Sequence, residues 1–249
     1  MSGLQSLAER TVLVTGGSRG IGAATARLLY ERGAEVILHY GNGVDAARSV
    51  AAELGDRVHL VQGDLTLHGA AEVVWRQAIA ATGRVDVLIN NAGAWIPSPV
   101  DDDAGWQEGW EANLALNLTA PAELCRQAIG HFRQRGGGIV INVTSRSAHR
   151  GDDADHLAYG AAKGGLLALT KGIARGYATD GILAYAIAPG WVATDIAAGA
   201  DIEQLAAALP LREVTPPTDV AEVITFLASG RARHTTGATI DITGADYVR

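Results

Sequence analysis

The sequence predicts a single α/β domain built on a doubly wound, seven-stranded parallel sheet. Short β-branched runs alternate along the chain with longer stretches of helical periodicity. Each short run is nearly continuous in apolar residues, which is typical of strands that are covered on both faces. No linker, repeat or low-complexity tract interrupts the 249 residues, so we expect one domain over 1–249.

Composition excludes several classes of protein. No apolar run reaches the roughly 18 residues of a membrane span, and the N-terminus carries no secretory signal pattern, so we expect a cytoplasmic protein without a membrane partner. The net charge of -7 argues against a nucleic-acid partner. Cys125 is the only cysteine, which excludes an intramolecular disulfide and a thiolate metal cage.

The elements alternate in order. The strand candidates are TVLVTG, AEVILHY, RVHLVQGD, RVDVLINNAG, GGIVINVTS, GILAYAIAPG and GATIDITG. The helices between them are expected at 20–32, 44–54, 68–82, 107–135, 156–179 and 218–229. Segment 193–217, between the last two strands, is the exception, and its position favours a lid over the ligand crevice.

A glycine loop joins the first strand to the first helix. Gly16, Gly20 and Gly22 follow the spacing G-x-x-x-G-x-G, which lets the backbone approach a pyrophosphate while the helix N-terminus supplies amide donors. Such a turn can also serve packing alone. The strand–turn–helix context favours the phosphate ligand.

The end of the second strand, VILHYGNG, bears on the choice of dinucleotide. An NAD site would place Asp or Glu there to accept hydrogen bonds from the ribose hydroxyls, and the segment has neither. Tyr40 occupies the expected position, and Arg19 in the glycine loop could bind a 2′-phosphate. We therefore predict NADP rather than NAD, with a solvated loop charge as the alternative for Arg19.

Tyr159 and Lys163 stand four residues apart in YGAAK, one turn apart on a helix, so their side chains can converge on one ligand. A phenol has a pKa of about 10 and is a poor acid or base at neutral pH unless a nearby cation lowers that value. With Lys163 as that cation, Tyr159 could exchange a proton with a carbonyl or alcohol oxygen. The alternative is a surface contact between the two side chains.

Five motifs together resemble the short-chain dehydrogenase/reductase family. They are TGGSRGIG, NNAG at 90–93, INVTS ending at Ser145, YGAAK at 159–163 and APGWVATD at 188–195, in the family's order. The resemblance covers essentially the whole chain and includes the 3-oxoacyl-carrier-protein-reductase-like members. It implies a Rossmann fold, an NAD(P)-dependent oxidoreductase acting on alcohol or carbonyl groups, and a homo-oligomer, with a tetramer favoured and a dimer as the alternative.

The resemblance also implies roles for four residues. Tyr159 would be the general acid/base, Lys163 its partner and a ligand of the nicotinamide ribose, and Ser145 the donor to the substrate oxygen. The fourteen positions from Ser145 to Tyr159 are one more than the family's usual spacing, so Ser147 stays as an alternative. Asn117 matches the family's fourth active-site residue.

Local chemistry bears on Asn117 separately. In a regular helix the carbonyl of Asn117 would accept a hydrogen bond from the amide of residue 121, but Pro121 has no N–H. The free carbonyl could instead hold a water molecule in a proton relay from Lys163. Asn113 shares that helical face but does not align with the family motif. We interpret it as structural.

The resemblance further implies a set of cofactor contacts. Asp64 and Leu65 would frame the adenine, and Asn91 would contact the adenosine ribose. Val192 and Thr194 would face the nicotinamide carboxamide. For Asp64 a helix cap is the alternative. The expected cofactor-binding set is Gly16, Gly17, Ser18, Arg19, Gly20, Ile21, Gly22, Tyr40, Asp64, Leu65, Asn91, Ala92, Gly93, Tyr159, Lys163, Pro189, Gly190, Val192 and Thr194.

The mouth of the site is expected from 94–97, 146–156 and the lid, together with one indole at Trp191. The candidate substrate contacts are Trp95, Trp191, His149, Arg150 and Asp152, a mixture that favours a polar, ring-shaped small-molecule substrate over a bare acyl chain. For each of these residues a surface or packing role is the alternative. The carboxylates of DDDAGW at 101–106 diverge on any regular backbone, so we assign no metal. Leu183, Ala184 and Tyr185 replace a common family RVN, far from the proposed chemistry.

Three other functions fit parts of the pattern. A nucleotide-sensing regulator would keep the glycine loop but would not need Tyr159, Lys163 and Ser145. An isomerase, epimerase or dehydratase would use the cofactor transiently. An enoyl reductase usually spaces its tyrosine and lysine more widely. Self-association is expected through the helices at 107–135 and 156–179 and the last helix and strand.

Overall fold

The computed structural model describes residues 6–194 and 202–249, and within them seven strands form one parallel sheet, which confirms the predicted fold class. The strand order is β3-β2-β1-β4-β5-β6-β7. The strands are β1 (Thr11–Val14), β2 (Glu35–Tyr40), β3 (Val58–Gln62), β4 (Val87–Asn90), β5 (Gly138–Val143), β6 (Ile182–Pro189) and β7 (Thr239–Ile242).

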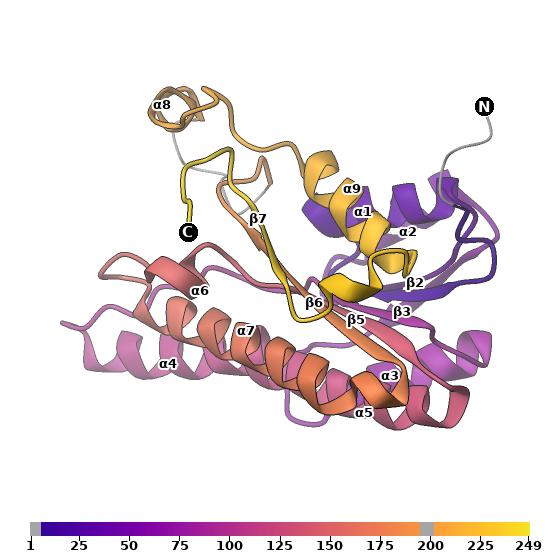
Figure 1. The fold of residues 1–249 in the computed structure, drawn as a ribbon. Helices are drawn as coiled ribbons and strands as arrows, with labels where there is room; N and C mark the ends of the chain where they lie inside the picture. Colours follow the sequence, from indigo (N-terminus) through magenta and orange to yellow (C-terminus); the bar gives the residue numbers. More distant parts are fainter. Residues whose placement is uncertain (1–5, 195–201) are drawn as a thin grey trace.

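Both faces of the sheet are covered by helices (Figure 1), with α1, α2 and α9 on one side and α3, α4, α5 and α7 on the other. The helices are α1 (Gly20–Glu31), α2 (Val44–Leu54), α3 (Ala70–Thr82), α4 (Asp103–Leu114), α5 (Ala120–Arg135), α6 (Ser147–Arg150), α7 (Leu157–Tyr177), α8 (Ile202–Ala208) and α9 (Pro217–Ala228). Single turns are η1 (Ala115–Thr119), η2 (Ala178–Asp180) and η4 (Arg233–Thr235).

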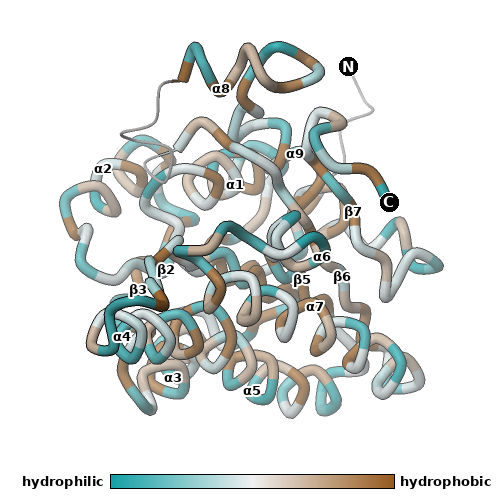
Figure 2. The backbone as a smooth tube through the Cα atoms, turned by 90° about the vertical axis from the view of Figure 1, so that its left-hand side faces the viewer, coloured by the Kyte–Doolittle hydropathy of each residue, from teal (hydrophilic) through white to brown (hydrophobic). Residues whose placement is uncertain are grey.

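The alternating direction of strand side chains explains the continuous apolar runs. On β1, Val12 and Val14 enter the cluster beneath α1, α2 and α9, whereas Leu13 between them enters the cluster beneath α3, α5 and α7. A strand buried on both sides has no solvent-facing position for a polar residue. Figure 2 shows the resulting hydrophobic stretches in the sheet and the more hydrophilic outer loops.

The helix predicted at 107–135 begins earlier, at Asp103, and contains the π-helical turn η1. The Ala120 amide donates to the Ala115 carbonyl five residues back. Pro121 supplies the physical reason, because it offers no N–H to the carbonyl of Asn117 and the regular pattern cannot continue through it. A widened turn therefore stands where the sequence places Asn117.

Only part of the segment 193–217 belongs to the described residues, because 195–201 lie outside them. The described part includes α8, which has no buried residue and stands apart from the sheet in Figure 1. Val192 forms an isolated bridge with Thr215, which ties the two ends of the segment together. Its role as a lid stays a prediction.

Two side chains with ionisable groups, a phenol and a thiol, are buried away from the cleft. Tyr185, in the stretch that departs from the family pattern, is fully buried, and its hydroxyl donates to the Ala232 carbonyl at 3.0 Å. Cys125 on α5 is also buried, which raises the pKa of its thiol to about 12. No described helix is long and apolar enough to cross a membrane.

Candidate active site

A cleft of about 1130 Å³ opens at the carboxyl ends of the strands. Its walls come from the loops that follow β1, β2, β3, β4, β5 and β6, together with Tyr159 and Lys163 of α7. The strand order reverses between β1 and β4, and open α/β sheets place their ligands at such a switch point.

The glycine loop forms one wall of the cleft. Gly16 and Gly20 have φ of +63° and +53°, a left-handed conformation that favours glycine. A side chain at Gly22 would place its Cβ 2.1 Å from the Gly16 carbonyl oxygen, and one at Gly17 would meet Leu38 at 2.7 Å. Gly17 and Gly22 therefore serve close packing and do not line the cleft, whereas Gly16, Ser18, Arg19, Gly20 and Ile21 do.

The loop is braced by Asn91, from the sequence NNAG. Its side-chain amide donates to the carbonyls of Thr15 at 2.9 Å and Gly16 at 3.1 Å. The Thr15 hydroxyl accepts from the amides of Asn91 and Ala92 at 3.0 Å each. Asn91, Ala92 and Gly93 line the cleft, so this motif both holds the glycine loop and borders the site.

The end of β2 differs from the prediction. The structure does not bring Tyr40 into the cleft, because its ring is 8% exposed and packs in the core beneath α1 and α2. His39, on the opposite face of the strand, lines the cleft instead, with Gly41 and Asn42 beyond it. The sequence shows His39 only as one polar residue in an apolar strand, which gave no reason to select it.

Asp64 and Leu65 line the cleft after β3, and their contact with an adenine stays a prediction. The Asp64 carboxylate accepts from the Thr66 amide at 3.0 Å and its hydroxyl at 2.7 Å. These bonds hold the pKa of Asp64 below its ordinary value. Asp64 thus forms a turn within the loop and is not the N-cap of α3, which is Gly69.

Pro189, Gly190, Val192 and Thr194 line the cleft after β6. A Cβ at Gly20 would lie 2.9 Å from the Thr194 side chain, so the glycine loop and this segment meet. The residues predicted to face the two ends of the dinucleotide thus border one continuous cleft.

Tyr159, Ser145 and Ser147 form the polar centre of the cleft. The Ser145 hydroxyl is hydrogen-bonded to Tyr159, and it also lies 3.1 Å from the Ser147 hydroxyl and accepts from the Ser147 amide at 3.1 Å. The wider spacing from Ser145 to Tyr159 is accommodated by α6 and the loop that follows it. Ser145 therefore contacts the phenol, with Ser147 bonded to Ser145.

The expected acidity of the phenol is not what the structure holds. Burial raises the pKa of Tyr159 to about 12, although the Ser145 hydrogen bond and the Arg146 charge act to lower it. Lys163 lies with its Nζ 5.7 Å from the centre of the Tyr159 ring. The prediction that Lys163 makes this phenol unusually acidic is therefore wrong, because desolvation on burial raises the pKa of the phenol instead.

Lys163 is 4% exposed, and its Nζ donates to the Val143 carbonyl at 3.0 Å. Burial lowers the pKa of Lys163 to about 8. A Cβ at Gly93 would lie 3.1 Å from this Nζ and 2.7 Å from Asn117 Oδ1, so glycine is needed there for the two side chains to approach the loop. The cation is thus held between β5 and the β4 loop.

Asn117 is fully buried and does not line the cleft. Its Nδ2 donates to the Ala94 carbonyl at 2.9 Å, and its Oδ1 accepts from the Ala94 amide at 3.3 Å. Asn113 accepts from Asn117 and donates to Ile96 and Gly109, a network within the fold. The side chain of Asn117 therefore shapes the loop after β4.

The outer end of the cleft is bordered by aromatic rings. Trp95 meets Trp191 edge to face with ring centres 5.7 Å apart, and His156 stacks on Trp95 at 3.6 Å. His156 is held in turn by Asp153, whose carboxylate lies 2.6 Å from Nδ1. Two indoles thus form a wall whose orientation is fixed by stacking and by a hydrogen bond.

Of the other substrate candidates, Arg150 and Asp152 line the cleft, whereas the His149 ring stacks on Tyr247 with centres 5.9 Å apart. Arg146 also borders the cleft, next to the Trp191 ring. Its guanidinium pairs with the carboxylate of Asp246 in the C-terminal segment, and burial lowers the pKa of Arg146 to about 10. No pattern in the sequence indicates this contact, because the two residues lie a hundred positions apart.

The cleft fits a dinucleotide. The N-terminus of α1 opens at Gly20 without a side-chain cap, so its amides can bind a pyrophosphate. Within residues 6–194 and 202–249, no three His, Cys, Asp or Glu side chains gather as metal ligands.

Comparisons with known proteins agree with this geometry. A family model described as "Enoyl-(Acyl carrier protein) reductase" matches residues 16–244. A cis-4-hydroxycyclohexanecarboxylate dehydrogenase of Sinomonas cyclohexanicum is 37% identical over 96% of this chain and 97% of its own. A 3beta-hydroxysteroid dehydrogenase 1 of Eggerthella lenta is 37% identical over 96% and 94%. A 3-oxoacyl-[acyl-carrier-protein] reductase of Synechocystis is 33% identical over 97% and 98%.

A solved dehydrogenase/reductase from Sinorhizobium meliloti 1021 superposes with a TM-score of 0.86 at 33% identity, covering 97% of each chain. The order of motifs, the parallel sheet and these relatives lead to one conclusion. The chain belongs to the short-chain dehydrogenase/reductase family of nicotinamide-dependent oxidoreductases acting on alcohol and carbonyl groups.

Proposed function

We propose that the chain is an NADP-dependent carbonyl reductase or alcohol dehydrogenase in which Tyr159 is the general acid/base. The observation that carries this proposal is the meeting of Tyr159, Ser145 and Lys163 in a cleft bordered by the glycine loop. The nicotinamide would supply or accept the hydride when bound.

The chain's own residues then handle the proton and the oxygen. With a pKa near 12, Tyr159 is protonated at neutral pH and can donate its proton to the oxygen of a carbonyl being reduced. The Ser145 hydroxyl stabilises the negative charge that develops on that oxygen. Lys163 and the main-chain carbonyl of Asn117 would connect the phenol to solvent through water.

In the direction of oxidation Tyr159 must first lose its proton. A phenol of high pKa resists this, so the positive charge of Lys163, present below pH about 8, would have to stabilise the phenolate when the dinucleotide is bound. The same ammonium would bind the nicotinamide ribose. The close spacing of Tyr159 and Lys163 favours carbon–oxygen redox chemistry over enoyl reduction.

NADP is favoured over NAD by the surroundings of the adenosine end. The segment from His39 to Gly43 contains no carboxylate to accept from ribose hydroxyls, and Arg19 borders the same part of the cleft. The bond between Asp64 and Thr66 engages that carboxylate in its own loop. A phosphate on the ribose would meet the Arg19 guanidinium.

The substrate we propose is a ring-shaped secondary alcohol or ketone. The edge-to-face pair of Trp95 and Trp191 offers a rigid apolar wall, while Arg150 and Asp152 offer polar contacts at the mouth. Two relatives are named for alcohols on saturated rings, a hydroxycyclohexanecarboxylate and a 3β-hydroxysteroid. A flexible acyl chain would gain less from a flat, fixed aromatic wall.

The test is turnover with cyclic ketones and alcohols, acyl thioesters and sugars, followed by NADPH absorbance. We expect Tyr159→Phe to lower kcat by about a thousandfold or more while the affinity for NADPH, measured by fluorescence titration, stays near that of the unchanged chain. Near-parental turnover of this variant would refute the role of Tyr159. A clear preference for NADH in kcat/KM would refute the cofactor assignment.

We also propose a homo-oligomer, with a tetramer favoured, assembled through α4, α5, α7 and the last helix and strand. Edge strand β7 is only partly covered, and Phe226 of α9 is 40% exposed. Light scattering behind size exclusion measures the mass, and a monomer at micromolar concentration would contradict the assembly.

A further inference from the structure

His39 connects two loops of the cleft with its ring alone. The Gly16 amide, in the glycine loop, donates to Nδ1 at 3.2 Å, and Nε2 lies 2.9 Å from the Gly63 carbonyl in the loop after β3. The ring is 2% exposed and borders the cleft. The imidazole therefore spans the gap between the loop predicted to hold the pyrophosphate and the loop predicted to hold the adenine.

These two partners determine the tautomer. A backbone amide can only donate and a carbonyl can only accept, so Nδ1 must be the bare nitrogen and Nε2 must carry the hydrogen. An imidazolium would point a second N–H at the Gly16 amide and lose that bond. The ring can thus satisfy both loops only when it is neutral.

The backbone beside His39 reinforces the same connection. The Gly17 amide donates to the His39 carbonyl at 2.8 Å, and the Gly63 amide donates to the Tyr40 carbonyl at 3.1 Å. A Cβ at Gly63 would lie 2.4 Å from Val74, so this loop also lies tight against α3. Both loops are therefore hydrogen-bonded to the backbone at the end of β2, and the His39 ring joins them through its side chain.

The charges around the ring do not supply a partner for an imidazolium. Arg19 and Asp64 border the same cleft, and the Asp64 carboxylate is bonded to Thr66. The ion pair of His59 with Glu35 lies nearer the N-terminal ends of β3 and β2, and that of Glu72 with Arg76 lies on the exposed side of α3. Burial is the main cause that lowers the pKa of His39, so the neutral form is favoured.

We propose that the neutral His39 ring is a positioning residue that sets the spacing of the pyrophosphate and adenine loops and thereby the affinity for the dinucleotide. This inference rests on the proposed function, because it needs a dinucleotide in the cleft. The strand that carries His39, β2, is separated from β5, which precedes the Ser145 loop, by β1 and β4, so we expect His39 to act on binding and not on the chemical step.

Three substitutions separate its two bonds. His39→Asn keeps an acceptor near the position of Nδ1, His39→Gln keeps a donor near that of Nε2, and His39→Phe keeps the ring shape and neither bond. We expect His39→Phe to raise the Kd for NADPH by about tenfold or more, and the other two variants to show smaller losses. At saturating NADPH, kcat should stay near that of the unchanged chain.

The matched control is His59→Phe, since His59 lies on the neighbouring strand outside the cleft and should leave the Kd unchanged. The tautomer is read separately by ¹⁵N NMR of the histidine rings, with the His39 signals identified by their loss in His39→Asn. We expect a bare Nδ1 and a protonated Nε2 between about pH 6 and 8.

Each outcome bears on one claim. An unchanged Kd in His39→Phe, or a loss of affinity accompanied by an equal loss of kcat, would overturn the positioning role, as would an Nδ1-protonated ring or an imidazolium in that pH range. If His39→Phe does not fold, the Asn and Gln variants decide the question, and parental affinity in both would overturn it. Failure of the unchanged chain to bind NADPH or NADH would instead refute the proposed function.

Discussion

The pKa values and contacts of single residues in the cleft are set by their burial in the folded chain more than by their spacing in the sequence. The spacing of Tyr159 and Lys163 predicts that they share a helical face, and both line the cleft. It could not show that desolvation would move the pKa of both groups against ionisation, because burial comes from β5 and the loop after β4. His39 was missed for a related reason, since only the folded sheet brings Gly16 and Gly63 to its two nitrogens.

The buried ammonium of Lys163 predicts a pH-dependent stability. Its pKa is about 8 in the folded chain and about 10.5 when unfolded, so between these values the unfolded chain binds more protons and stability rises with pH. Lys163→Met should therefore increase the free energy of unfolding at pH 7 by on the order of 1–3 kcal/mol, allowing for the lost bond to Val143. The gain should vanish near pH 10.5.

Urea denaturation across this pH range measures the effect. Lys171 is the other lysine of the chain and is exposed, so Lys171→Met is the control and should show no such pH dependence. A destabilised Lys163→Met at pH 7 would mean that the ammonium is better solvated than its burial implies.

At the scale of elements, the sequence predicts most of the sheet. Each strand is found within a few residues of its apolar run, because a strand covered on both faces must be apolar throughout. The early start of α4 and the turn η1 were not predicted, since helical periodicity does not distinguish a regular helix from one with a single widened turn. The proline at position 121 was the available signal.

Pro121→Ala should test how η1 positions Asn117. The alanine restores an N–H that can donate to the Asn117 carbonyl, so a regular helix becomes possible and the Asn117 side chain would turn away from Ala94. We expect kcat to fall by about tenfold or more while Tm is unchanged or higher. The measurement is kcat beside calorimetry, and a fall in kcat accompanied by a large drop in Tm would point to simple unfolding.

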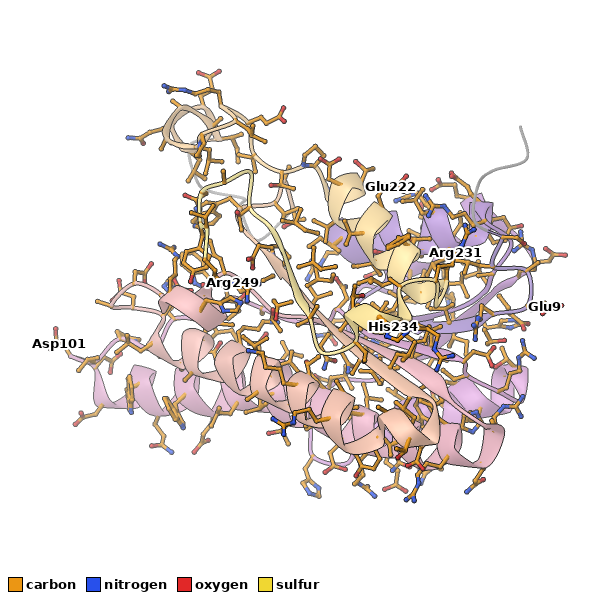
Figure 3. All side chains as sticks on the ribbon, viewed as in Figure 1. Glu9, Asp101, Glu222, Arg231, His234 and Arg249 are labelled. Atoms are coloured by element: carbon orange, nitrogen blue, oxygen red, sulfur yellow. The ribbon has the colours of Figure 1, made fainter. Side chains whose placement is uncertain are left out.

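Across the whole molecule, the C-terminal segment is tied to the active-site loop. Two contacts join residues about a hundred positions apart: the ion pair of Asp246 with Arg146 and the stacking of Tyr247 on His149. A third contact, the hydrogen bond from Arg249 to Asp241 at 2.9 Å, ties the end of the chain to β7. Figure 3 shows Arg249 in this last segment. No local pattern could predict these contacts.

Asp246→Asn should leave the Arg146 guanidinium poorly paired in a largely buried position. We expect a loss of about 1–3 kcal/mol in the free energy of unfolding, below the cost at a fully buried pair because Asp246 is 24% exposed, and a lower kcat/KM because Arg146 adjoins Ser145. Chemical denaturation and steady-state kinetics measure both. Asp101→Asn, at an exposed point of the loop before α4 (Figure 3), is the control, and equal behaviour of the two variants would contradict the importance of the pair.

The single thiol of Cys125 can report how often α5 separates locally from the sheet. Alkylating reagents attack the thiolate, and a group that ionises only near pH 12 beneath packed helix and sheet offers them neither charge nor access. Labelling at neutral pH must therefore wait for α5 to lift from the sheet, so the modification rate, followed by mass spectrometry with and without dinucleotide, counts those openings directly.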